Sequence, residues 1–191
     1  MVFYYVSYHR ILQNAVVSVP SNVKRLSSHA FYRKYDLVHV TVPQGVTNIG
    51  KNAFAECSSL KGVSLPSSVM RMGERSFYQC GLLESISIPN QMTEIEDAFF
   101  VACSSLKSVK YPANLKRIGS SAFSSCASLE KLEIPIGVTN VGEYAFVCCN
   151  GLSSVRILSP VLRGTALRLR SRNRKARPHF SRCWSIRRKS R

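Results

Sequence analysis

Apolar residues recur along the chain with a period of 23 residues, and a short polar and apolar alternation lies within each period. Ahead of each repeated proline, two apolar residues are separated by one, as in Val40 and Val42 or Ile86 and Ile88. This spacing is typical of a β-strand with one buried face. The period is kept by Pro20, Pro43, Pro66, Pro89, Pro112 and Pro135, and by Phe31, Phe54, Phe77, Phe100, Phe123 and Phe146.

The remainder of each unit predicts how the chain returns to the next strand. After the proline come two apolar residues, such as Val46 and Ile49, and in most units a glycine, such as Gly50. A short segment around an Ala-Phe pair follows, and then a cysteine and a leucine. About seven apolar side chains per unit cannot offset the conformational entropy lost on ordering the unit alone. The units must therefore stack on one another.

This pattern predicts an α/β repeat solenoid, with a parallel β-sheet on one face and short helical or irregular segments on the other. Residues 1–16 are expected to form a partial N-terminal repeat, because Phe3 and Tyr8 fit the register; the chain would then begin inside a unit, as a fragment does. Residues 17–157 form the solenoid of about six units. Residues 158–191 lose the register and are expected to be a basic, disordered tail.

The segments "NIGKNAFAECSSLKGVSLP" (48–66) and "IGSSAFSSCASLEKLEIP" (118–135) resemble the repeat of the BspA-like leucine-rich repeat family. That family carries an "IG..AF..CSSL..(I/V).IP" pattern, and here the resemblance covers residues 17–157. It implies a leucine-rich-repeat-like stack without enzymatic activity. It also implies a surface antigen or adhesion protein at the surface of a microbial or protozoan cell, with host, matrix or surface proteins as partners.

The residues between the apolar pairs should point outward and form an exposed sheet face. A solenoid presents such a face as a stiff surface whose side chains the fold does not constrain, so we take it as the candidate partner-binding surface. Its members are His39, Thr41, Lys61, Gly62, Ser64, Ser85, Ser87, Ser108, Lys110, Lys131 and Glu133.

Five cysteines fall at the same position of successive units and should form a ladder with the spacing of parallel strands, roughly 4.8 Å. They are Cys57, Cys80, Cys103, Cys126 and Cys149. Buried free thiols are the preferred interpretation, while disulfides or a metal site remain alternatives. The neighbouring Cys148 should point away from the core and be the more reactive thiol.

No catalytic, cofactor or metal site is predicted. An S-x-x-K pattern occurs at Ser58 to Lys61 and again at Ser104 to Lys107, but both copies fall in the turn before a strand. The four histidines are scattered, and only His39 should lie on the sheet face. Three acidic residues, Glu94, Glu96 and Asp97, cluster in a turn that we expect to be solvated, with a local cation or partner contact as the alternative.

The net charge of +17 is concentrated at the C-terminal end. Residues 156–191 contain 13 of the 27 Lys and Arg residues and no Asp or Glu. The net charge therefore cannot be used to infer the function of the solenoid. Three interpretations of this tail remain open. It is a nucleic-acid-binding or nuclear-targeting patch, a solvated, disordered extension, or an artefact of translating the end of the gene in the wrong reading frame. The candidate anion-binding residues are Arg168, Arg170, Arg172, Arg174, Lys175 and Arg177.

No apolar run is long enough for a membrane span, and the N-terminus lacks the pattern of a signal peptide. A cytoplasmic protein therefore stays an alternative to the extracellular or cell-surface location that the resemblance implies. The leading functional hypothesis is a non-enzymatic protein-binding module. The alternative is a nucleic-acid-associated or nuclear protein that acts through the basic tail.

Overall fold

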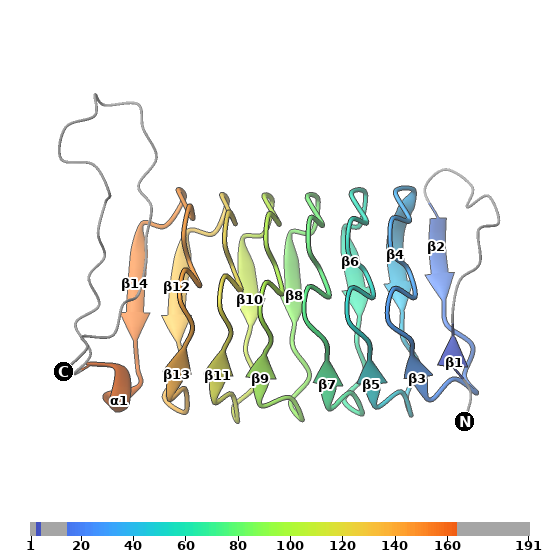
Figure 1. Cartoon of the computed structure of the whole chain (residues 1–191), viewed down its shortest axis with the longest axis horizontal. Coiled ribbons are helices and arrows are strands. Elements are labelled where there is room, and N and C mark those ends of the chain that lie inside the picture. The colour runs from blue at the N-terminus through green and yellow to red at the C-terminus, as the bar shows by residue number, and fades with distance from the viewer. Residues whose placement is uncertain (1–2, 5–14, 164–191) are drawn as a thin grey trace.

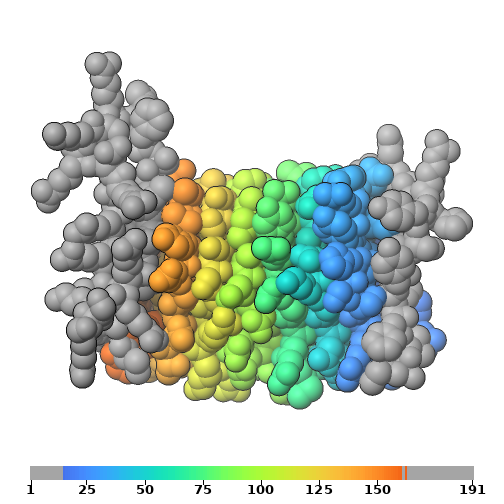
Figure 2. Space-filling model, viewed as in Figure 1, coloured from blue at the N-terminus to red at the C-terminus, as the bar shows by residue number. Residues whose placement is uncertain are grey.

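The computed structural model describes residues 3–4 and 15–163, and the chain winds through them as a solenoid (Figure 1). In the space-filling view the successive coils form bands that follow one another in chain order (Figure 2). Each coil corresponds to one 23-residue unit of the sequence, so the predicted repeat solenoid with parallel strands is present.

The predicted strands form a row along one side of the solenoid, which we call the first row. All pairs within it are parallel, and equivalent residues of successive units face each other, as Val40 faces Val63 and Val109 faces Ile86. The first row consists of β2 (Ala15–Ser18), β4 (Leu37–Thr41), β6 (Gly62–Ser64), β8 (Ser85–Ser87), β10 (Ser108–Lys110), β12 (Lys131–Ile134) and β14 (Ser154–Ile157).

A second row of strands lies where the sequence predicted only an apolar turn after each proline. Its two-residue strands also pair in parallel, as Ile49 of β5 does with Met72 of β7. The row consists of β1 (Phe3–Tyr4), β3 (Arg25–Leu26), β5 (Asn48–Ile49), β7 (Arg71–Met72), β9 (Glu94–Ile95), β11 (Arg117–Ile118) and β13 (Asn140–Val141). The apolar member of each described pair from β3 to β13 is buried.

The segments around the Ala-Phe pairs are irregular, so the helical option of our prediction is wrong for them. Each segment contains two residues with positive φ, such as Asn52 at 55° and Glu56 at 59°. A left-handed residue stops a right-handed helix at once. Its backbone instead bonds to the next coil, with Glu56 N–H donating to Tyr78 C=O over 2.7 Å. In residues 3–4 and 15–163 the one α-helix is α1 (Pro160–Arg163).

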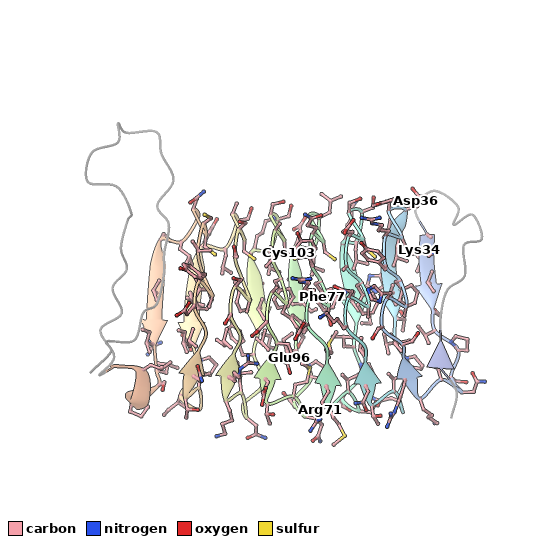
Figure 3. All side chains as sticks on the ribbon, in the orientation of Figure 1. Lys34, Asp36, Arg71, Phe77, Glu96 and Cys103 are labelled. Carbon is pink, nitrogen blue, oxygen red and sulfur yellow. The ribbon has the colours of Figure 1, made fainter. Side chains whose placement is uncertain are left out.

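The core is a column of phenylalanine rings that runs along the solenoid. Phe54 and Phe77 are fully buried, and their ring centroids lie 5.2 Å apart with planes 7° from parallel. Phe77, which is labelled in Figure 3, also stacks on Phe100 at 5.6 Å. One aromatic ring per coil therefore joins each described coil to its neighbours, which is the stacking that a repeat without a core of its own requires.

Both rows are interrupted at the same place, because β6 does not pair with β8 and β7 does not pair with β9. Position 96 explains the second-row break. In most other coils a glycine stands here, and a Cβ on Gly73 would lie 2.6 Å from Lys51 N of the preceding coil. Glu96 carries that Cβ, so its coil cannot approach as closely. Figure 3 shows Glu96 beside β9.

Two further observations agree with a local separation of the coils at Glu96. Phe99 is buried at a position that Ala or Ser occupies in the other coils, and its ring packs edge-on against Phe77 at 5.6 Å. A hollow of about 200 Å³ lies between β7 and β9, with Met70 and Glu96 among its lining residues. Val63 and Leu65 before the break are only half-buried, whereas Val40, Val42, Ile86 and Ile88 at the same positions of the two neighbouring coils are buried.

A second interruption affects the first row alone. β10 does not pair with β12, although β9, β11 and β13 remain continuous in the second row. Tyr111 stands here in an otherwise aliphatic column that includes Ile88 and Ile134. Its ring lies edge-on to Phe123 with centroids 6.2 Å apart. We attribute the break to this larger ring, which does not fit the space of a branched aliphatic side chain. In Figure 1, β10 and β12 are visibly more widely spaced than β8 and β10.

The described solenoid extends a few residues past 157, where the sequence placed the start of the tail. Leu158 N–H donates to Ile134 C=O over 3.0 Å, and the Ser159 hydroxyl donates to Val138 C=O over 2.6 Å. Ser159 and Leu162 are buried. Ser159 and Leu162 therefore belong to the packed part of the protein.

Candidate functional surface

The sheet face predicted from the sequence lies on the first row, and its residues are exposed or half-buried. Thr41, Lys61, Ser64, Ser85, Ser87, Ser108, Lys110, Lys131 and Glu133 are exposed, and His39 and Gly62 are half-buried. The structure adds Ser154 and Arg156 of β14 to this face, since both are exposed and continue the register of β12.

At the N-terminal end of the sheet face, three residues interact across two strands. The His39 imidazole Nε2 lies 3.1 Å from the Ser64 hydroxyl. A Cβ on Gly62 would lie 2.7 Å from His39 Nδ1, so the ring occupies the space above this glycine. His39 is therefore a partly buried member of the face, and Gly62 is less accessible to a partner than the sequence suggested.

The C-terminal end of the sheet face carries the charge. Glu133 lies 3.6 Å from the guanidinium of Arg156 on the neighbouring strand. The two lysines at this end of the face, Lys110 and Lys131, form no ion pair within residues 3–4 and 15–163. At this end of the face, a partner can reach these two ammonium groups without breaking an existing pair.

A slot between β10 and β12 was missed by the sequence reasoning. It is a hollow of about 640 Å³ at the first-row break, lined by Lys107, Ser108, Val109, Tyr111, Ala113, Leu129, Glu130, Lys131, Glu133, Pro135, Ile136 and Leu158. The half-burial of Val109 and Tyr111 shows that the slot exposes side chains of the inner surface. The sequence signal was Tyr111 itself, the one aromatic residue in its column.

The second S-x-x-K match is engaged in structural contacts. Ser104 donates its hydroxyl hydrogen to Gly81 C=O over 3.2 Å, and Lys107 Nζ lies 2.9 Å from a Glu84 carboxylate oxygen. These contacts link one coil to the preceding one. In the first match, Ser58 and Lys61 are exposed on the surface.

The acidic cluster that we expected to be solvated surrounds an arginine. Arg117 contacts Asp97 over 2.6 Å, Glu96 over 3.0 Å and Glu94 over 3.5 Å. Asp97 also accepts a bond from Ser120 N–H. The cluster therefore makes a local cation contact, with a side chain of the next coil as the cation. In the described ranges no group of three or more His, Cys, Asp or Glu is arranged to hold a metal ion.

The cysteine ladder consists of five free, buried thiols, which agrees with the preferred interpretation of the sequence. Each thiol donates to the carbonyl oxygen of a phenylalanine in the preceding coil, as Cys103 Sγ does to Phe77 over 3.0 Å. Burial raises the pKa of Cys57 and of Cys149 to about 12. Burial also raises the pKa of Cys103 well above its ordinary value. The thiolate is the reactive form of cysteine, so the ladder is chemically inert while the coils stay stacked.

We predict that five of the seven cysteines are protected from thiol reagents until the chain unfolds. Replacing Cys148 and Cys183 by serine leaves only the ladder thiols, and labelling with Ellman's reagent at pH 8 should then be negligible until guanidinium is added. Because folding raises the ladder pKa values, the unfolded chain loses these protons first as pH rises. The free energy of unfolding should therefore fall from about pH 9 upward. Labelling of the double variant at the wild-type rate would contradict this prediction.

The six candidate anion-binding residues of the tail, Arg168 to Arg177, lie outside the described residues. Within the described residues, no helix is long and apolar enough to cross a membrane.

The repeat also matches known proteins. The family model for the BspA type leucine rich repeat region matches residues 24–153 of the sequence, in six copies. The chain belongs to this family. A leucine-rich cell surface protein of Faecalibacterium prausnitzii is 31% identical to this BspA-type protein, with a TM-score of 0.74 over 83% of this chain and 43% of its own length. The leucine-rich repeat protein of T. pallidum is 32% identical, with a TM-score of 0.70 over 74% of this chain and 68% of its own length.

A third solved structure, a leucine-rich repeat protein of Bacteroides ovatus, is 27% identical with a TM-score of 0.53, over 78% of this chain and 35% of its own length. This BspA-type chain thus spans less than half the length of the F. prausnitzii and B. ovatus proteins that it matches. Comparison with curated protein sequences gave no significant match.

Proposed function

We propose that this chain is a non-enzymatic module that binds other proteins, and that it belongs to an adhesion protein or antigen at the cell surface. The observation that carries the proposal is the contrast between the two sides of the first row. Inward positions repeat the same apolar types, while outward positions change from Thr41 and Ser64 to Lys110 and Glu133. The fold does not require these outward residues, so their chemistry is available for a partner.

Three further points support this function. The sheet face is a stiff surface because stacked coils hold its strands in register. The serines and lysines of the S-x-x-K pattern lie in turns, and Ser104 and Lys107 are bound to the neighbouring coil. One of the similar proteins is described as a cell surface protein. The sheet face has few aromatic residues, which usually dominate binding energy, so we expect weak binding that multivalent display would strengthen.

The proposal is tested by measuring the binding of the full chain to an array of purified extracellular matrix and cell-surface proteins. We expect at least one to bind, and the double variant Lys110→Glu and Lys131→Glu to slow association and to weaken its dependence on salt. The matched control is Arg71→Glu with Arg75→Glu, which makes the same charge change on β7 and in the turn after it, where both arginines are exposed. Equal effects of the two double variants would contradict a role for the sheet face.

A further inference from the structure

The slot between β10 and β12 leaves backbone groups without the partners that they have elsewhere in the solenoid. In the preceding coil, Ile88 N–H donates to Lys110 C=O over 2.9 Å. The corresponding bond from Tyr111 N–H to Glu133 C=O is absent from the part of the chain that the structure describes. Two neighbouring strands of the first row therefore face each other with unpaired edges, and an exposed strand edge is a template for another extended chain.

A second backbone bond is missing at the other end of the slot. Lys107 N–H donates to Glu84 C=O over 2.8 Å, and Ser153 N–H donates to Glu130 C=O over 2.9 Å. The bond between these two coils, from Glu130 N–H to Lys107 C=O, does not occur in the described ranges. Donors and acceptors are thus available at both ends of the slot, spaced along the strand direction as the main chain of an extended peptide requires.

The interior of the slot suits an apolar side chain. Val109 and Tyr111 are half-buried in it, and Ile136, a residue that is 69% exposed, lines it. Burial raises the pKa of the Tyr111 phenol, which is consistent with an apolar environment. The volume of about 640 Å³ falls in the range of about 300 to 1,000 Å³ that is typical of binding pockets.

The rim of the slot selects the charge of a ligand. Lys131 lines the slot and Lys110 lies on the neighbouring strand, and neither has an ion-pair partner within residues 3–4 and 15–163. Of the two acidic lining residues, Glu133 is already paired with Arg156, whereas Glu130 has no ion pair in the described ranges. Two available ammonium groups thus outnumber one available carboxylate. Acidic residues of a partner can therefore meet two available ammonium groups beside the apolar interior.

We propose that the slot binds an extended peptide segment of a protein partner, in which one aromatic or aliphatic side chain is flanked by acidic residues. The side chain enters between Val109 and Tyr111, the main chain bonds to the edges of β10 and β12, and the acidic residues contact Lys110 and Lys131. This is strand addition with a side-chain pocket. The inference rests on the proposed protein-binding function and names the chemistry of its partner.

The test uses the full chain and the fluorescein-labelled peptide Gly-Asp-Thr-Phe-Thr-Asp-Gly, followed by fluorescence anisotropy. Replacing the phenylalanine of the peptide by alanine is expected to weaken binding by roughly tenfold to a hundredfold, which corresponds to losing one buried aromatic side chain. A peptide with both aspartates replaced by lysine is expected to bind several-fold more weakly. Amide shifts in NMR spectra should move at Tyr111 and Glu130 when the peptide binds.

Two variants of the protein locate the site. Ile136→Asn places a polar side chain at the slot and is expected to weaken peptide binding by roughly tenfold. Val16→Asn makes a comparable change at the far end of the solenoid, where Val16 is 70% exposed against 69% for Ile136, and should leave binding unchanged. Both positions are exposed, so neither change should unfold the protein.

Failure of this inference is distinguishable from failure of the proposed function. No binding of the peptide, or equal binding by wild type and Ile136→Asn, overturns the slot as a peptide site. If matrix or surface proteins still bind in a manner that depends on Lys110 and Lys131, the sheet face retains its function without the slot. If neither the peptide nor any protein of the array binds, both proposals are overturned.

Discussion

Replacing Phe77 by alanine is expected to lower the free energy of unfolding by about 3–5 kcal/mol, the range for large-to-small changes in a packed core. Phe77 is fully buried and stacks on two rings, Phe54 at 5.2 Å and Phe100 at 5.6 Å. The substitution therefore removes contacts at two coil interfaces at once, and the cavity cannot close because both neighbours are held by their own coils. Chemical denaturation followed by circular dichroism measures the loss.

The control for this prediction is Phe146→Ala, the same change at the last ring of the column. Phe146 is also buried but stacks only on Phe123 among the described residues, at 5.2 Å. Its removal should cost less and should loosen only the C-terminal coil, since stability in a repeat array depends on nearest-neighbour interfaces. Equal losses for the two variants would show that the ring column does not couple the coils.

Replacing Gly73 by alanine is expected to destabilise the protein by about 3 kcal/mol, the upper part of the typical range for overpacked sites. The new Cβ would lie 2.6 Å from Lys51 N and 2.8 Å from Lys51 Cα, both backbone atoms that cannot rotate away. The coils would have to separate, with loss of the bond from Gly73 N–H to Ile49 C=O. The midpoint of thermal unfolding reports the change.

Two matched variants test this explanation. At Gly81 a Cβ would meet only the Ser104 hydroxyl at 3.7 Å, so Gly81→Ala should be close to neutral or slightly stabilising. The reverse change, Glu96→Gly, restores the small residue where the rows are interrupted. It should allow β7 and β9 to pair, which slower amide hydrogen exchange at residue 96 would detect. Because the change also removes the contact of Glu96 with Arg117, exchange rather than stability is the deciding measurement. An unchanged exchange rate at residue 96 would refute the link between this side chain and the break.

The sequence predicted the architecture because period and residue type were sufficient for it. Val40 and Val42 alternate with Thr41, and one proline per unit ends the strand, so the first row and its outward face follow directly. The helical option failed because it depends on φ at positions such as Arg75 and Ala98, where the residue types do not reveal a left-handed backbone. The second row was missed because two-residue strands give no periodic signal.

The candidate site was only partly accessible to sequence reasoning. A list of outward residues follows from alternation, but the slot depends on two strands failing to pair. The departures that accompany the interruptions were visible as single residues: Tyr111 in a column of aliphatic residues, and Glu96 at a position that is glycine in most units. Their effect on the neighbouring coils could be predicted only with atomic distances. Whether an added Cβ atom disturbs the stacking of two coils depends on how close the backbone of the neighbouring coil lies.

The interruption at Glu96 also has a mechanical meaning. A load applied along the solenoid axis is transmitted from coil to coil by backbone bonds and by ring stacking. At this interface neither row of strands is paired, since β6 does not bond to β8 and β7 does not bond to β9. The two coils are joined by backbone bonds between their turns, such as Phe77 N–H to Phe99 C=O at 3.0 Å, and by the stacked rings of Phe77 and Phe100. Under tension the molecule would therefore part here first, into two blocks that each keep their own stacked coils.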